Sequence, residues 1–100
     1  MSKYHAIPDE VDGIRFASRA EARRYKELKL LERAGKISGL KLQPVFQLHA
    51  GIKYIADFEY YENGRLVVED VKGMETKEFR LKKRLLLADY PDLDFRIVRG

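Results

Sequence analysis

The hydrophobic and polar positions of the chain predict two helices. Residues 18–34 are rich in helix-forming residues, and the segment ends at Gly35. Its first residues have the form of a capping box, with Ser18 at the N-cap and Glu21 three positions later. A second helix is predicted over residues 76–90, because a threonine can cap its start and a proline follows its end.

Four further segments have the pattern of strands. Residues 40–48 alternate between apolar and polar side chains and contain a proline, which indicates a sheet edge or a bulge. Residues 52–61 are rich in β-branched and aromatic side chains. Asn63-Gly64 is a strong hairpin signal, so this segment should pair antiparallel with residues 65–72. The last strand is predicted over residues 94–98.

The order of elements is therefore helix, three strands, helix, strand. A connection through the second helix can place the final strand parallel to the third. This order predicts an α/β fold with a mixed sheet flanked by helices. One hundred residues suit a single domain, residues 1–100, because two cores would each be too small. Residues 1–15 are predicted to be an N-terminal arm with a turn at Asp12-Gly13.

Composition and charge indicate a folded, basic protein without cysteine. With 45% hydrophobic and 36% charged residues, the chain should fold rather than remain disordered. A net charge of +4 and a pI near 9.4 favour polyanions as partners, although a merely soluble basic surface explains the charge equally well. No cysteine is present, so any metal would bind oxygen or histidine. Without an apolar leader or membrane-spanning run, we expect a cytoplasmic protein.

Candidate chemistry lies on the predicted hairpin. Side chains two positions apart in a strand share a face, so Asp70 and Lys72 should project together, and Glu69 and Val71 to the other side. The neighbouring strand carries Asp57 within an otherwise apolar stretch. A buried carboxylate without a partner is costly, so Asp57 needs a structural or functional reason.

Two interpretations of these residues remain open. In the structural one, Asp57 forms an ion pair with Lys72 or caps a local amide. In the functional one, Asp57 and Asp70 together hold a hard divalent cation such as Mg²⁺ or Mn²⁺, while Lys72 faces the substrate.

The same residues resemble the PD-(D/E)-x-K nuclease superfamily, also called restriction-endonuclease-like. Asp57 and Asp70-Val71-Lys72 match its signature, although Ala56 stands where many members have proline. More narrowly, strings at residues 13–18, 43–46, 54–58 and 69–73 look like a family of small phage and prophage proteins in that superfamily, and the similarity spans nearly the whole chain. The resemblance implies a core of helix, three strands, helix, strand, and a metal-dependent endonuclease that hydrolyses DNA.

The superfamily often adds an acidic residue from the first helix, and Glu21 is the candidate here. Glu21 stands at helical spacing with Tyr25 and Leu28, so it should share the core-facing side of that helix. It would complete the metal shell directly or through water. A glutamate three residues after Ser18 is also what a capping box needs, so capping alone remains an alternative.

Substrate binding would fall to basic side chains of the second helix, although a solvated helix face explains them equally well. Tyr60 and Tyr61 near the hairpin tip could also touch DNA, but strand packing accounts for them as well. The predicted nucleic-acid-binding residues are Lys77, Arg80, Lys82, Lys83 and Arg84.

The second helix has two apolar stripes, one with Leu81, Leu85 and Ala88 and the other with Phe79 and Leu86. One stripe should pack on the sheet, and the other could meet a second subunit. Nucleases that cut both strands of a duplex or junction commonly pair their sites by two-fold symmetry, so we expect a homodimer.

The leading hypothesis is thus a Mg²⁺- or Mn²⁺-dependent endonuclease acting on duplex or branched DNA, with host-cell cytoplasm as its place if the protein is phage-encoded. The alternatives are a non-catalytic nucleic-acid-binding or assembly protein on the same fold, and a structural domain. His5 and His49 lack the spacing of a metal pair, and we assign them no catalytic role. No nucleophile elbow or glycine-rich phosphate loop is visible in the sequence.

Overall fold

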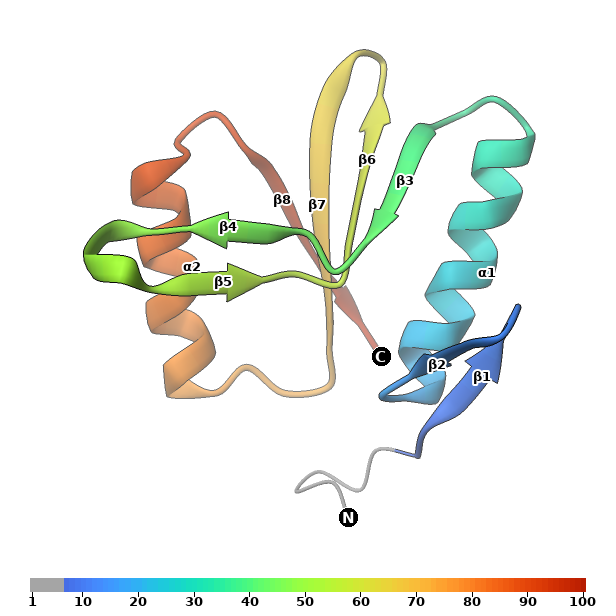
Figure 1. Ribbon diagram of the computed structural model, residues 1–100, viewed down its shortest axis with the longest axis horizontal. Coiled ribbons are helices and arrows are strands. Elements are labelled where there is room, and N and C mark those ends of the chain that lie inside the picture. The colour runs from blue at the N-terminus through green and yellow to red at the C-terminus, as the bar shows by residue number, and fades with distance from the viewer. Residues whose placement is uncertain (1–6) are drawn as a thin grey trace.

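A four-stranded mixed sheet forms the centre of the protein (Figure 1). We describe residues 7–100 of a computed structural model. The strands lie in the order β3-β6-β7-β8, and their bounds are β3 Ser38–Leu42, β6 Phe58–Glu62, β7 Arg65–Lys72 and β8 Asp94–Arg99. β3, β6 and β7 are antiparallel neighbours, whereas β8 runs parallel to β7. The predicted mixed sheet and its parallel final strand are confirmed.

Two helices cover opposite sides of the sheet in Figure 1, α1 (Arg19–Arg33) and α2 (Lys77–Asp89). Both agree with the predicted helices, and both begin at the predicted caps. The Ser18 hydroxyl accepts a hydrogen bond from the Glu21 amide at 3.1 Å, and the Thr76 hydroxyl accepts one from the Phe79 amide at 3.1 Å. Side-chain caps of this kind satisfy amides that the first helical turn leaves unpaired.

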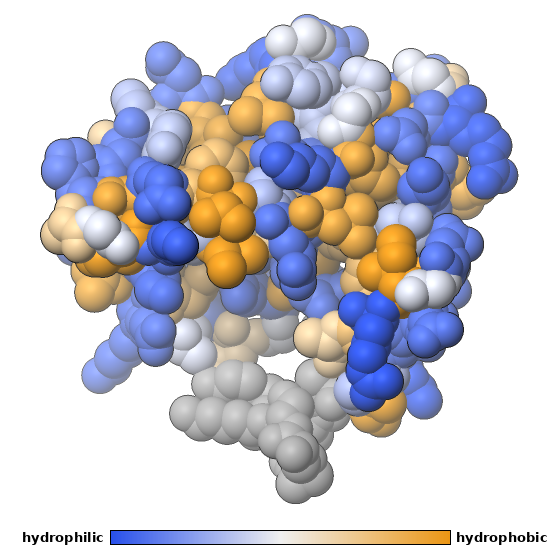
Figure 2. Space-filling model, viewed as in Figure 1, coloured by the Kyte–Doolittle hydropathy of each residue, from blue (hydrophilic) through white to orange (hydrophobic). Residues whose placement is uncertain are grey.

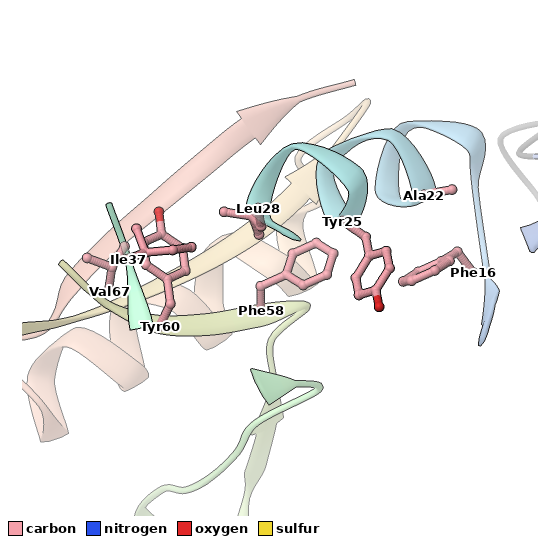
Figure 3. Close-up of a cluster of buried hydrophobic side chains, with 8 residues drawn as sticks. All are labelled: Phe16, Ala22, Tyr25, Leu28, Ile37, Phe58, Tyr60 and Val67. Atoms are coloured by element: carbon pink, nitrogen blue, oxygen red, sulfur yellow. The ribbon is translucent and has the colours of Figure 1, made fainter. Parts of the chain in front are cut away.

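The core has two halves, one on each face of the sheet. The half beneath α1 contains aromatic and aliphatic side chains of α1, β6 and β7 together with Phe16 (Figure 3). The half beneath α2 contains Phe79 and Leu86 of the helix with Tyr54, Ala56 and Val68. The Phe79 and Leu86 stripe of α2 is therefore the one that packs on the sheet, and Leu81 remains 55% exposed.

Two predicted strands are each broken, and both predictions of a continuous strand were wrong. Residues 40–48 divide at Gln43-Pro44 into β3 and β4 (Val45–Gln47). Residues 52–61 divide at Ala56-Asp57 into β5 (Lys53–Ile55) and β6. β4 and β5 pair with each other as a separate hairpin, closed by the short 3-10 helix η1 (His49–Gly51), and this hairpin crosses in front of α2 in Figure 1.

The predicted arm is partly structured. β1 (Asp9–Val11) and β2 (Ile14–Phe16) form an antiparallel hairpin around the predicted turn, where Asp12 and Gly13 both have positive φ. The Tyr25 hydroxyl on α1 donates a hydrogen bond to Asp12 Oδ2 at 3.1 Å, which ties the hairpin to the helix. Residues 1–6, including His5, lie outside the described part of the chain.

The predicted turn between β6 and β7 is also confirmed, with positive φ at Asn63 and Gly64. Within residues 7–100, none of the helices is both long and apolar enough to cross a membrane. Hydrophobic and hydrophilic side chains alternate over the face seen in Figure 2. The predicted homodimer stays a prediction.

Candidate active site

Strand β7 presents one buried carboxylate to each face of the sheet. Glu69 points to α1, where its carboxylate pairs with Arg24 through two bonds, Nε to Oε1 at 2.8 Å and Nη2 to Oε2 at 2.7 Å. The Tyr60 hydroxyl also donates to Glu69. Asp70, the next residue, has its side chain on the α2 face and is only 1% exposed. The alternation predicted for this strand is therefore present.

Asp57 lies at the break between β5 and β6 rather than in the middle of a strand. Phe58 and Glu69 are the last pair of the β6–β7 register, and Asp57 lies just beyond it. Its Oδ2 accepts a hydrogen bond from the Val71 amide at 2.7 Å, and its own amide donates to the Glu69 carbonyl at 3.1 Å. Asp57 thus caps a local amide. Among residues 7–100 it forms no ion pair with Lys72 within 4.0 Å.

Glu21 at the start of α1 meets Asp57. The Glu21 carboxyl accepts a hydrogen bond from the Ala17 amide at 3.0 Å, so it does act in capping the helix. Burial, together with a hydrogen bond to Asp57 and the repulsion of its charge, raises the pKa of Glu21 to about 8, despite the opposing effects of the Ala17 amide and Lys72. Glu21 therefore bonds locally at the start of α1 and also interacts with Asp57, and its role as a metal ligand stays a prediction.

Asp70 is held in a different environment from Asp57. Desolvation raises the pKa of its carboxyl to about 6, although the Lys72 charge and the Asp57 amide both favour the ionised form. The Tyr54 hydroxyl of β5 donates a hydrogen bond to Asp70 Oδ2. The β4–β5 hairpin therefore reaches over the α2 face of the sheet and contributes a side chain to the site.

Lys72 completes the group. It is half-buried at the end of β7, and its Nζ lies 4.7 Å from the centre of the Phe79 ring at the start of α2. Its charge lowers the pKa of both Glu21 and Asp70, so it lies within electrostatic reach of both carboxyls. Residues from α1, the β5–β6 break and β7 therefore meet at one end of the sheet.

The donor set is partly suited to a divalent cation. Carboxylate oxygens are what Mg²⁺ and Mn²⁺ prefer, and the pKa of Glu21, raised first by burial and then by Asp57, means that a bound cation would favour its charged form. Within residues 7–100, however, no three Asp, Glu or His side chains lie close enough together to hold a metal ion. Mg²⁺ commonly keeps several waters and takes only one or two protein carboxylates, so a closed set of three is not required.

A cavity of about 250 Å³ opens beside the carboxyl pair. Glu21 and Asp57 form part of its wall, and apolar side chains of β2, β3 and β6 form much of the rest. Arg15 and Gln43 also line it. The cavity therefore adjoins the α1 side of the site, where the two carboxyls interact directly.

Four of the five predicted nucleic-acid-binding residues surround one shallow hollow of about 420 Å³ on α2, and these are Lys77, Arg80, Lys83 and Arg84. Lys83 also pairs with Glu75 at 3.6 Å, and Lys82, outside the hollow, pairs with Glu78 at 3.7 Å. Tyr60 is buried in the core and bonded to Glu69, so strand packing is the explanation that holds of the two left open for it. Tyr61 is 46% exposed.

Sequence reasoning missed the partners that position the predicted residues. Tyr54 and Arg24 come from segments distant from the Asp-x-Lys motif, and only the fold brings them to Asp70 and Glu69. The sequence did contain a partial signal that Arg24 lies near the site, because it stands one helical turn after Glu21 and shares its side of α1. His49 pairs with Asp89 at the surface, away from these residues.

Comparisons with known proteins identify a family. A family model described as "Protein of unknown function (DUF1064)" matches residues 1–100. No curated protein matches the chain.

Proposed function

The chain belongs to the DUF1064 family, and we propose that it is a metal-dependent endonuclease that hydrolyses phosphodiester bonds in DNA, of the PD-(D/E)-x-K kind. The observation that carries this proposal is the interaction of Glu21 with Asp57, with Lys72 within electrostatic reach of both Glu21 and Asp70, whose pKa values are raised to about 8 and about 6. Strongly shifted groups with specific charge partners are typical of functional sites.

The arrangement suits phosphodiester hydrolysis because it offers both signs of charge. Asp57 and Asp70 would hold a Mg²⁺ or Mn²⁺ ion, with Glu21 contributing directly or through water. When bound, such an ion supplies an activated water near neutral pH and neutralises charge on the phosphate. Lys72 would orient the attacking water or stabilise the charge that develops on the phosphate oxygens.

The surrounding residues would keep this set in place. The Val71 amide holds the Asp57 carboxylate at 2.7 Å, and the Tyr54 hydroxyl holds Asp70. Burial of Asp70 also excludes water, which strengthens its interaction with Lys72. Duplex or branched DNA would bind through phosphate contacts to the α2 hollow.

Cleavage assays with site variants test the proposal. Purified protein should cut labelled linear, flapped or four-way DNA in Mg²⁺ or Mn²⁺. Asp70→Asn and Lys72→Ala should each lower the rate by at least about a hundredfold, the scale of losing an electrostatic group at the reacting centre. The matched controls Asp92→Asn and Lys36→Ala change exposed residues and should cut like the wild type. Failure of the wild-type protein to cut any of these substrates would overturn the proposal.

One observation favours the second candidate, a non-catalytic nucleic-acid-binding protein. The cationic hollow on α2 needs no metal to bind phosphate, and within residues 7–100 no three-carboxylate metal group is formed. This candidate requires DNA binding that is the same in Mg²⁺, Ca²⁺ and chelator. A mobility-shift assay under these three conditions, run beside the cleavage assay, separates the two functions.

A further inference from the structure

Gln43 has a backbone conformation that its residue type does not favour. Its φ is +50°, in the left-handed region, where glycine is favoured and most other residues are strained. Of the three other non-glycine residues with positive φ, Asp12 and Asn63 lie in hairpin turns and are of the types that tolerate this region best, and Ala50 lies in the 3-10 helix η1 that closes the β4–β5 hairpin. Gln43 instead lies at the break between β3 and β4. Strained backbone of this kind often accompanies a functional site.

The strain is maintained by its surroundings. The backbone amide of Gln43 donates a hydrogen bond to the Asp57 carbonyl at 3.0 Å, and the backbone amide of Ala56 donates to the Pro44 carbonyl at 3.1 Å. The Pro44 side chain is fully buried. The break in β3–β4 is therefore bonded directly to the break that carries Asp57, and Gln43 keeps a fixed position relative to the carboxyl pair.

The cavity beside that pair has a polar side and an apolar one. Gln43 and Arg15 line it with Glu21 and Asp57, while Phe16, Leu42 and Phe58 supply apolar surface. Its volume of about 250 Å³ is just below the range of about 300–1,000 Å³ found for pockets that bind drug-sized ligands. A cavity of this size and lining suits a single flat ring system.

Arg15, on β2, is the basic side chain that lines this cavity. It is exposed and, among residues 7–100, has no acidic side chain within 4.0 Å. The Tyr25 hydrogen bond to Asp12 ties its hairpin to α1, the helix that carries Glu21. Although Glu10 is its cross-strand neighbour on β1, the Arg15 guanidinium forms no ion pair within residues 7–100 and lines the same cavity as the two carboxyl groups, so it is available for a phosphate of the substrate.

We propose that Gln43 and Arg15 form a nucleotide-binding subsite next to the scissile phosphate, in which the cavity takes one nucleobase of the bound DNA strand. The side-chain amide of Gln43 would pair with the base edge through its donor and acceptor, and Arg15 would contact the adjoining phosphate. This subsite rests on the proposed nuclease function and makes Gln43 a specificity-determining residue.

The Gln43→Gly substitution separates an effect on DNA binding from an effect on folding. Gln43→Gly removes the side chain and suits the positive φ, so the variant should unfold at the same or a higher urea concentration than the parent. The matched control is Asn63→Gly, which makes the same kind of change at a positive φ in the distant β6–β7 turn. A purely structural Gln43 would give both variants the DNA affinity of the parent.

Fluorescence anisotropy measures that affinity. An Asp70→Asn background prevents cutting, and the labelled probes are a linear duplex and a four-way junction in Mg²⁺. Gln43→Gly should weaken binding about tenfold, as expected for losing one bidentate base contact. Arg15→Ala should lower the salt dependence of log K by about 0.9, the effect of one lost phosphate contact. Arg33→Ala, at the far end of α1, is its control and should change the slope less.

Abasic substitutions identify the base. Removing one base at a time from the probe should reveal a position where the parent loses about tenfold in affinity and Gln43→Gly loses nothing further, because the two changes remove the same contact. Additive losses would overturn the base contact. Unchanged binding by Gln43→Gly and Arg15→Ala would overturn the subsite while leaving the nuclease proposal standing. If the Asp70→Asn protein with Gln43 and Arg15 intact bound neither probe, both the subsite and the nuclease proposal would be overturned.

Discussion

At the scale of single residues, Glu21 shows how one carboxyl group can serve two purposes. It caps α1 through the Ala17 amide, and it also faces Asp57, whose charge and hydrogen bond favour the protonated form. Its pKa of about 8 lies above the ordinary value of 4.5, so between these two pH values the folded protein keeps a proton that the unfolded chain has lost. The free energy of unfolding should therefore fall as the pH rises from 4.5 to about 8.

Glu21→Gln should remove this pH dependence. The variant and the wild type should have similar urea midpoints near pH 4.5, and the variant should be the more stable near pH 8, since glutamine carries no charge to desolvate. Asp70, with a pKa raised to about 6, adds a similar loss at lower pH in both proteins. Urea unfolding followed by circular dichroism at several pH values measures the difference. Parallel pH profiles for the two proteins would contradict the prediction.

Tyr54 supports Asp70 through one hydroxyl group. Tyr54→Phe keeps the packed ring but leaves the buried carboxyl without this donor. We expect a loss of about 1–3 kcal/mol in the free energy of unfolding, greater above pH 6 than below it, where Asp70 is protonated. Urea unfolding at pH 5 and pH 7.5 tests this. Tyr61→Phe, at an exposed position, is the matched control, and an equal effect from both variants would argue against the role of Tyr54.

At the scale of elements, the Arg24–Glu69 pair determines how α1 lies on the sheet. Glu69 is 0% exposed, and Arg24 binds both of its carboxylate oxygens. Such a pair has a fixed geometry, which sets the position of α1 relative to β7. Glu21 lies one turn before Arg24 on the same helix, so the ion pair also determines where Glu21 meets Asp57.

Arg24→Ala should therefore be strongly destabilising. It leaves the Glu69 charge buried without its cation, and breaking a buried pair in this way costs about 3–5 kcal/mol. Arg23→Ala is the control, because Arg23 is exposed and surface changes usually stay within about 0.5 kcal/mol. Chemical denaturation of both variants gives the comparison. Equal stability of the two would show that the ion pair does not hold α1 in place.

At the scale of the whole molecule, the site joins the two halves of the core. Glu21 belongs to the helix over one half, whereas Asp70, Tyr54 and Phe79 belong to the other. The cost of charging Glu21 and Asp70 therefore arises in both halves, first from burial and, for Glu21, also from the charge of Asp57. A bound cation would relieve it and stabilise the entire fold.

Divalent cations should consequently raise the melting temperature. Mg²⁺ or Mn²⁺ at about a hundred times its dissociation constant would add about 2.7 kcal/mol, and the effect should be larger at pH 8 than at pH 6, since Glu21 must lose its proton. Asp57→Asn keeps an acceptor for the Val71 amide and should abolish the shift. Thermal unfolding with NaCl at matched ionic strength is the control. An equal shift in Asp57→Asn would contradict a metal site at this residue.

Local signals in the sequence were sufficient for much of the fold. The caps at Ser18 and Thr76 marked both helix starts, and Asn63-Gly64 marked the hairpin, because each depends on hydrogen bonds or backbone angles within a few residues. The bounds of β7 and the faces of Glu69 and Asp70 followed from alternation along one strand. The parallel β7–β8 pairing followed from the helix between them.

Pro44 indicated an edge or a bulge, and the first strand does break there, but only the tertiary structure decided that the chain leaves the sheet and which side chains meet. Ala56-Asp57 continues a strand pattern in sequence, yet the β4–β5 hairpin turns away there to cover the α2 face. The contacts of Glu21 with Asp57 and of Tyr54 with Asp70 depend on this turn and on the position of α1. Such contacts join residues far apart in the chain, and burial, rather than local propensity, determines them.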